Sequence, residues 1–210
     1  MLKNIYLFIK KRMRNDVKII IKHYFYLIIK KDYHQMSLSN KKYKNCELGK
    51  RCFILGNGPS LNDINIELLK NEEIFTVNQI NRSDIFNKIK PKYHYIADGD
   101  FFFLDDKDPG EAERLKYIKQ LQNSEELVCI FPYYSKSFFD SLNFSNKIIY
   151  FNIYQDATKK PIKSFDMTLG IPTLRTVVQT AIYSAIHFGY QEIYLLGVEN
   201  TNYSSLLNQM

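Results

Sequence analysis

A glycine-rich turn, placed between an apolar run and a segment of helical spacing, constrains this chain more than any other feature. The turn is Gly56–Ser60, with the sequence Gly-Asn-Gly-Pro-Ser, and it follows the apolar run Cys52–Leu55. Leucine and isoleucine recur at helical spacing in Leu61–Leu69. The pattern predicts a buried strand, a tight turn and a helix. Such a turn directs backbone N–H groups and a positive helix end toward one point, which suits a phosphate.

Each position of the turn has an expected role in holding a nucleotide. Gly56 and Gly58 allow positive φ and let a ligand approach the backbone closely. Ser60 can cap the following helix and reach a phosphate oxygen, and Asn57 offers donors and acceptors to a sugar or base. We therefore expect nucleotide contacts from all five residues, Pro59 included. An ordinary strand-to-helix turn is the alternative, because such turns are common in α/β folds.

Two familiar phosphate-binding motifs are excluded by the residues present. The chain has no Walker run of Gly, four residues and Gly-Lys-Ser/Thr. A dinucleotide fingerprint needs a third glycine where Leu61 stands, and an acid at the end of the next strand. That strand, Ile74–Val77, is followed by Asn78 and Gln79, which argues against a nicotinamide enzyme.

Charge divides the chain into two expected parts. Residues 1–50 hold 13 of the 29 Lys and Arg residues but 3 of the 22 Asp and Glu residues, so this part carries +10 and the remainder −3. The basic character therefore belongs to an arm, and the main domain is not predicted to bind nucleic acid. The three cysteines show no metal-ligand spacing and fit a reducing compartment, which predicts a cytoplasmic protein.

The arm predicts an amphipathic helix that is too polar to cross a membrane. Basic residues interrupt every apolar run, so no stretch approaches the ~20 apolar residues that a spanning helix needs. Between Val17 and Ile28, apolar residues recur at helical spacing. Residues 1–35 could thus lie on an anionic membrane surface, on the inner face of the cell membrane. Packing on the protein's own core or on another subunit is an equal alternative, and residues 37–50 are interpreted as a linker.

Beyond residue 50, apolar strands alternate with helical segments. Strands are expected at 52–55, 74–77, 93–97, 127–131, 147–151 and 192–196. Asp108–Glu111 predicts a helix start with Asp108 as N-cap, and the most regular helical stripe, Leu174–Ile186, is stopped by Gly189. The sequence therefore predicts an α/β fold: a Rossmann-like, mostly parallel sheet with helices on both faces over residues 51–210. The basic helical arm and linker, residues 1–50, precede it.

Ligands of such sheets lie beyond the carboxyl ends of the strands, where this chain has polar loops. Thr168-Leu169-Gly170, before the regular helix, predicts a second phosphate-facing helix start. Asp98 and Asp100 follow a strand and could hold Mg²⁺ or Mn²⁺ against a diphosphate, although two acids around a glycine also make a good turn. His187 is interpreted as a core residue or a helix-dipole partner rather than a base.

The segment Arg51–Leu61 resembles the opening of the MptE-like, motility-associated-factor superfamily. Its Gly-Asn-Gly-Pro-Ser turn is also similar to that of the bacterial sialyltransferases that make lipooligosaccharide. Val77–Gln79 resembles their second nucleotide-contacting stretch, and Thr168–Gly170 with Glu192–Gly197 resembles a later segment. The resemblance covers about residues 50–200.

This resemblance implies a nucleotide-binding transferase of polysaccharide or glycan synthesis. The donor would be a CMP-activated nonulosonic sugar and the acceptor a glycan or small molecule; the alternatives are diphosphate transfer to a pterin alcohol and a non-catalytic nucleotide-binding module. By matching position, Asn57, Gly58, Ser60, Asn78 and Gly170 would hold the nucleotide.

The chain departs from the sialyltransferase pattern where the general base is concerned. Those enzymes carry a base histidine beyond the last strand, whereas no histidine follows His187 here. They also have Ser where Leu169 stands and Asp where Glu199 stands. We expect a C-terminally truncated chain; a different base, or binding without turnover, are the alternatives. Asp98, Asp100 and Glu199 are the candidate catalytic acids.

Overall fold

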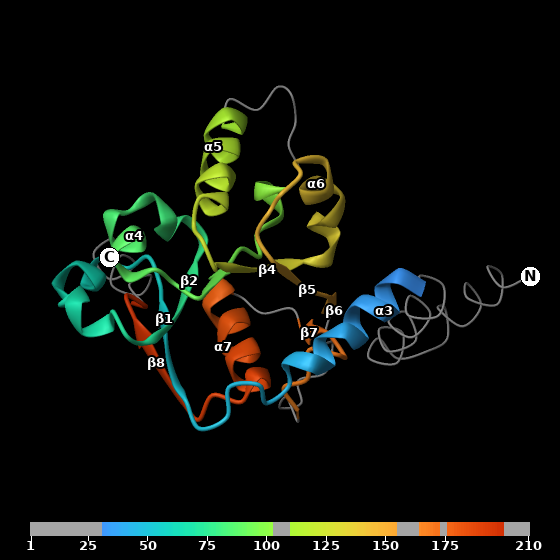
Figure 1. Ribbon diagram of the computed structural model, residues 1–210, viewed down its shortest axis with the longest axis horizontal. Coiled ribbons are helices and arrows are strands. Elements are labelled where there is room, and N and C mark those ends of the chain that lie inside the picture. Colours follow the sequence, from blue (N-terminus) through green and yellow to red (C-terminus); the bar gives the residue numbers. More distant parts are fainter. Residues whose placement is uncertain (1–30, 103–109, 155–163, 173–175, 200–210) are drawn as a thin grey trace, which may run out of the picture.

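A six-stranded, all-parallel sheet forms the centre of the computed structural model, which describes residues 31–102, 110–154, 164–172 and 176–199 (Figure 1). The strand order is β5-β4-β3-β2-β1-β8. The six strands are β1 (Arg51–Leu55), β2 (Glu73–Val77), β3 (Tyr93–Tyr95), β4 (Val128–Pro132), β5 (Ile148–Phe151) and β8 (Glu192–Leu196). All six expected strands are present, with small shifts of their ends, and the predicted parallel α/β sheet is confirmed.

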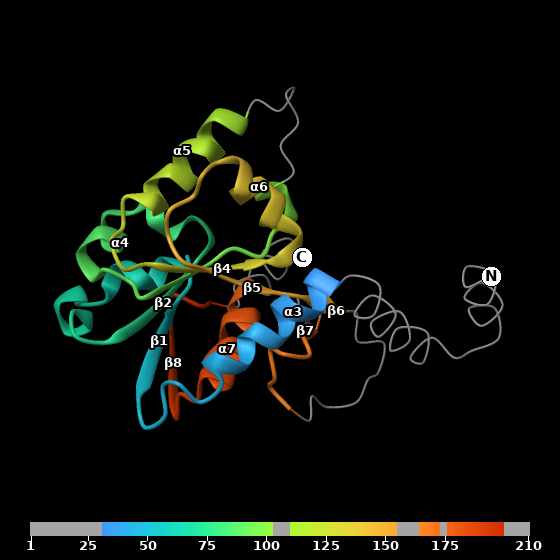
Figure 2. The same ribbon diagram turned by 45° about the vertical axis from the view of Figure 1, so that its right-hand side comes forward.

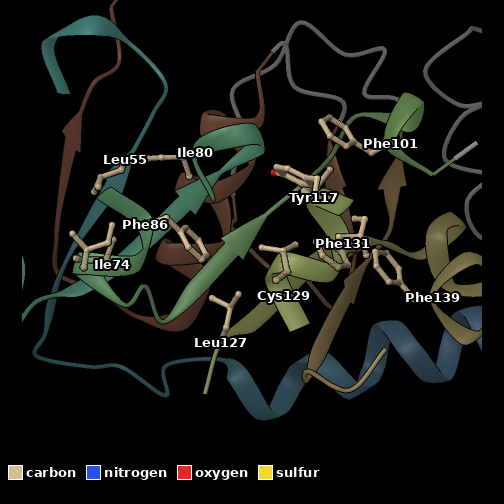
Figure 3. Packing of buried hydrophobic residues seen from close by; sticks show 14 of the residues in the cluster. Leu55, Ile74, Ile80, Phe86, Phe101, Tyr117, Leu127, Cys129, Phe131 and Phe139 are labelled. Atoms are coloured by element: carbon tan, nitrogen blue, oxygen red, sulfur yellow. The ribbon is translucent and has the colours of Figure 1, made fainter. Parts of the chain in front are cut away.

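Helices cover both faces of the sheet, as predicted (Figure 2). One face carries α4 (Asp84–Ile89), α5 (Glu111–Gln122) and α6 (Lys136–Ser141), and the other carries α3 (Lys31–Ser39) and α7 (Val177–Phe188). Figure 3 shows the hydrophobic core between the sheet and the helices α4, α5 and α6, in which Tyr117 of α5 and Phe139 of α6 pack toward Phe131 of β4. Burial on both faces explains why the inner strands are almost continuously apolar.

Short elements fill the connections. A second, two-stranded parallel sheet pairs β6 (Ile153–Tyr154) with β7 (Ile171–Pro172). The 3₁₀ helices are η1 (Asn40–Tyr43), η2 (Pro59–Asp63), η3 (Ile66–Leu69), η4 (Asn78–Arg82), η5 (Gly99–Phe101) and η6 (Tyr133–Ser135).

The predicted helix over Leu61–Leu69 is wrong, because two 3₁₀ helices, η2 and η3, replace it. Ile64 ends the first, and Asn65 begins the second, where its side chain accepts a hydrogen bond from the N–H of Glu67. Asn and Asp side chains compete in this way for backbone groups and so disfavour a continuous helix. The positive end of a full α-helix is therefore not available beside the glycine-rich turn.

The ends of two other helices allow a direct comparison with the sequence. α7 ends at Gly189, whose φ of 91° places it in the left-handed region, as predicted. α5 begins at Glu111 after Gly110 as N-cap, so the prediction of Asp108 at that position is wrong. Asp108 itself lies outside the described residues, as do Leu174 and residues 1–30 of the predicted amphipathic arm.

Residues 37–50 are packed against the domain rather than forming a linker. The side chain of Asn40 donates to the carbonyl of Tyr150 (2.9 Å), and the N–H groups of Asn45 and Glu47 donate to the last carbonyls of α7. Ser37 and Asn40 are buried. Several polar residues of this stretch thus make internal hydrogen bonds, so a polar composition did not indicate exposure.

His187 holds the same region together and lies away from the carboxyl ends of the strands. Its Nδ1 accepts from the N–H of Met167 (3.3 Å) and its Nε2 donates to the carbonyl of Asn40 (3.0 Å), which fixes a neutral tautomer. The prediction of a core role is confirmed. Across residues 31–102, 110–154, 164–172 and 176–199, no helix has the length and apolar character to span a bilayer.

Candidate functional site

A pocket of about 820 Å³ opens at the carboxyl ends of β1, β2, β3 and β8. Its walls are mixed. Apolar side chains come mainly from β6, β7 and the first turn of α7, and polar groups come from the loops that follow the strands. Lining residues are Gly56, Asn57, Gly58, Pro59, Val77, Asn78, Ala97, Asp98, Ile153, Ile171, Pro172, Thr176, Val177, Val178, Thr180, Gly197, Val198 and Glu199.

The topology of the sheet accounts for this position. The chain runs from β1 outward through β2, β3, β4 and β5, whereas β8 pairs with the opposite edge of β1. The loops after β1 and β8 meet at the point where the strand order reverses, and the pocket opens beside them. Ligands of open parallel sheets bind in such crevices.

The glycine-rich turn is closed by the end of β8 instead of presenting its donors to solvent. The N–H of Gly56 donates to the carbonyl of Leu196, and that of Gly58 to the carbonyl of Gly197, both at 2.8 Å. Gly58 has φ −75°, and Gly56 is not among the residues with positive φ. The expectation of positive φ at both glycines is therefore wrong, and these two N–H groups are already paired.

Close packing explains why both positions are glycine. A Cβ on Gly56 would lie 2.3 Å from the carbonyl oxygen of Gly197, and a Cβ on Gly58 would lie 1.3 Å from Oε2 of Glu199. The predicted close approach thus occurs, but the approaching group is the protein's own Gly197–Glu199 segment. Ser60 is not a cap either, since the N-cap of η2 is Gly58.

Glu199 lies against the turn. Its Oε1 accepts a 2.7 Å hydrogen bond from the N–H of Ser60, while its Oε2 is buried and has no hydrogen-bond partner. Hydrogen bonds from the side chain and backbone of Ser60 lower the pKa of the Glu199 carboxyl, so it is ionised at neutral pH. A lowered pKa also makes this residue a poorer general base than an ordinary glutamate.

Asn78 presents an unusual combination of backbone and side chain at the pocket wall. Its φ of 50° is in the left-handed region, which few residues other than glycine adopt. Its side-chain oxygen is buried without a hydrogen-bond partner. A ligand hydroxyl or amino group placed there would satisfy this acceptor, in agreement with the prediction that Asn78 contacts the ligand.

The start of α7 is the element of the site that the sequence analysis missed. Thr176 accepts from the N–H of Gln179, and the Gln179 side chain accepts from the N–H of Thr176, both at 3.2 Å. This is a capping box, and the spacing Thr-x-x-Gln at 176–179 is its sequence signal. Thr176, Val177 and Val178 line the pocket, so the positive end of a 12-residue helix faces it.

Four further predicted contacts lie outside the pocket lining. Thr168, Leu169 and Gly170 form a turn before β7 instead of a helix start, and none of them lines the pocket. Thr168 donates to Asp166 through its hydroxyl (2.6 Å) and its N–H (2.9 Å), and Leu169 is exposed. Gln79 is exposed on η4, also outside the lining.

The two acids predicted to hold a metal, Asp98 and Asp100, lie on either side of Gly99 after β3. Asp98 lines the pocket, and Asp100 lies in η5. Among the described residues there is no group of three or more His, Cys, Asp or Glu side chains that could hold a metal ion. Mg²⁺ in nucleotide sites is usually held by one or two carboxylates together with substrate phosphates, so Asp98 fits as one such ligand.

The fold and this pocket define a parallel α/β protein with a ligand-sized crevice at the reversal of strand order. A protein-family model described as 6-hydroxymethylpterin diphosphokinase MptE-like matches residues 23–203, and the chain belongs to this family. The resemblance seen in the sequence is thereby confirmed. No curated protein matches the chain.

One solved structure similar to this chain is the MAf glycosyltransferase from Magnetospirillum magneticum AMB-1. The two are 18% identical with a TM-score of 0.47, over 80% of this chain and 28% of the glycosyltransferase chain. This chain therefore matches less than a third of that protein's length.

Proposed function

We propose that this protein is a nucleotide-dependent transferase whose donor binds in the pocket at the carboxyl ends of β1, β2, β3 and β8. The observation that carries the proposal is the convergence of the loops after β1, β2, β3 and β8 with the positive end of α7 on one crevice. A volume of about 820 Å³ is within the range of small-molecule sites and is large enough for a nucleotide with an attached group.

For the donor we propose a CMP-activated nonulosonic sugar, in line with the resemblance of the turn and of Val77–Gln79 to sialyltransferases. The phosphate would lie between the glycine-rich turn and the first turn of α7, which both contribute to the pocket lining, and Asn78 would accept a hydrogen bond from the base or ribose. The enzyme would then place the anomeric carbon beside an acceptor hydroxyl and stabilise the leaving phosphate electrostatically. Asp98 is the candidate base, because Glu199 is engaged by Ser60.

A second candidate is diphosphate transfer to a pterin alcohol, the reaction in the family's description. Among the described lining residues, two are acidic and none is basic. A divalent cation arriving with a nucleoside triphosphate would offset that negative charge, with Asp98 as one of its ligands. The cation would supply charge neutralisation to the phosphates.

Calorimetric titration of the full chain with CMP and with ATP, each with and without Mg²⁺, tests the proposal and separates the two candidates. We expect CMP to bind without metal, and Asn78→Ala to weaken CMP binding about tenfold through loss of one hydrogen bond. Asn71→Ala, at an exposed asparagine before β2 and outside the pocket lining, is the matched control and should leave affinity unchanged. Binding of ATP only with Mg²⁺ would favour diphosphate transfer, and binding of neither nucleotide would contradict the proposal.

A further inference from the structure

We propose that the Glu199 carboxylate competes with the ligand's phosphate for the Ser60 N–H, so that a bound phosphate displaces this side chain. The inference rests on the proposed function, because it concerns the phosphate of the ligand in that pocket. It makes Glu199 a built-in competitor that sets affinity and selects for ligands carrying a phosphate.

The geometry places Glu199 where an anionic oxygen of a ligand would sit. Its Oε1 is 2.7 Å from the Ser60 nitrogen, and its Oε2 occupies the space that a side chain on Gly58 would fill. Gly58, Pro59 and Glu199 line the pocket, and Ser60 follows Pro59 directly outside that lining. The site therefore has the room and the donor for an oxygen anion, and a carboxylate from the same chain already uses both.

Among the described hydrogen bonds that tie the turn to the end of β8, only the contact between Ser60 and the Glu199 carboxylate involves a group that a ligand can replace. Two others join backbone groups, from Gly56 to Leu196 and from Gly58 to Gly197, and breaking them would open the sheet edge. The bond to Ser60 involves a side chain, which can rotate away without moving the backbone.

The remaining oxygen of Glu199 favours such a rotation. Oε2 is buried and has no hydrogen-bond partner, an arrangement that costs free energy for a carboxylate. Rotation into solvent would hydrate Oε2 and so offset part of the lost bond to Ser60. Displacement by a phosphate therefore needs less than the full energy of a charged hydrogen bond.

Simultaneous binding of both anions at Ser60 is unfavourable, since two negative groups within a few ångströms repel each other. Removing the charge at position 199 should strengthen phosphate binding. If Glu199 instead bound the ligand directly, by accepting a hydrogen bond from it, the same change should weaken binding. The two roles thus predict opposite signs.

The experiment compares the full-length chain with Glu199→Gln and Glu199→Ala by calorimetric titration with CMP, cytidine and pyrophosphate. We expect both variants to bind CMP about tenfold more tightly, the alanine variant at least as strongly as the glutamine variant, with no change for cytidine, which lacks a phosphate. Glu67→Gln is the matched control: it removes one negative charge from an exposed side chain on η3. Its affinities should equal those of the unmodified chain.

Pyrophosphate separates failure of this inference from failure of the proposed donor. Tighter pyrophosphate binding by the Glu199 variants, with no CMP binding by any of the proteins, would support the competition and contradict the cytidine donor. Unchanged or weaker binding of both phosphate-containing probes would overturn the inference, as would an equal gain for cytidine. Thermal unfolding of each variant shows whether it is folded, and an unfolded glutamine variant leaves the alanine variant to decide.

Discussion

His94 is enclosed in a buried polar chain between β3 and α5. The Thr76 hydroxyl donates to the carbonyl of Tyr93 (3.2 Å) and also lies 2.9 Å from Nδ1 of His94, so Nδ1 is the donor in that contact. Nε2 then accepts from the hydroxyl of Tyr117 at 3.1 Å. Every polar atom of the ring has a partner, and no charge is present to favour a second proton. Burial lowers the pKa of His94 to about 3.

This histidine should make stability fall in mildly acidic solution. In the unfolded chain its pKa returns to about 6.5, so the unfolded state binds more protons than the folded state at every pH between those two values. The contribution of His94 to the free energy of unfolding is therefore fully present above about pH 6.5 and decreases as the pH drops toward 3. Between neutral pH and pH 5 we expect a loss of about 2 kcal/mol from this residue, at about 1.4 kcal/mol for each pH unit below 6.5.

Urea denaturation of the unmodified chain and of His94→Gln, at several pH values in that range, measures this contribution. The substitution is expected to lower stability at pH 7, because it disturbs the buried chain of hydrogen bonds. It should also give a flatter dependence on pH, which a purely structural defect would not. Equal slopes for the two proteins would show that His94 is not the group that titrates.

At the scale of elements, α7 links the fold to the pocket, and its cap offers a direct test. Thr176→Ala removes the hydroxyl that satisfies the Gln179 N–H, and such losses cost about 1 kcal/mol. Thr176→Ser retains the hydroxyl and should keep most of that stability. The measurement is the free energy of unfolding in urea. Equal destabilisation by alanine and serine would mean that the methyl group, rather than the cap, is what α7 needs.

The same elements show what local sequence can and cannot predict. The strands and the body of α7 were predictable because apolar periodicity and the stop at Gly189 act within one turn or strand. The helix after the glycine-rich turn was not, since Asn65 redirects the backbone there by its own hydrogen bond. Thr168–Gly170 was misplaced because a β-strand pair, β6 with β7, depends on contacts distant in sequence.

The site shows the same division. Asn78 and Asp98, predicted to bind a nucleotide and a metal ion, both line the pocket because the ends of parallel strands meet at one edge, and their ligand contacts stay predictions. The pairing of the glycine-rich turn with the end of β8 joins residues about 140 positions apart, and no local pattern reports it. The glycines were thus predicted for backbone conformation, whereas the structure requires them for space.

At the scale of the whole molecule, the chain before β1 belongs to the fold from about residue 37. Asn40 bonds to β5 and to His187, and Asn45 and Glu47 bond to the end of α7. Glu47 also accepts hydrogen bonds from Lys50 (2.8 Å) and Lys92 (2.7 Å). These contacts connect the N-terminal segment to β5, to the end of α7 and to Lys92 before β3, so they stabilise the domain as a whole.

Two deletions distinguish this structural segment from the basic residues before it. Removal of residues 1–50 should lower the free energy of unfolding by at least about 3 kcal/mol, because three or more buried hydrogen bonds worth about 1 kcal/mol each are lost and their partners remain unpaired. Removal of residues 1–30 leaves all of these contacts, so the stability of the shortened chain in urea should match that of the full chain.

The shorter deletion also tests our proposal that the arm binds membranes: the full chain should sediment with anionic liposomes and the shortened chain should not. A large loss of stability on removing residues 1–30 would show that the apolar stripe between Val17 and Ile28 packs on the protein itself, and would contradict the membrane role.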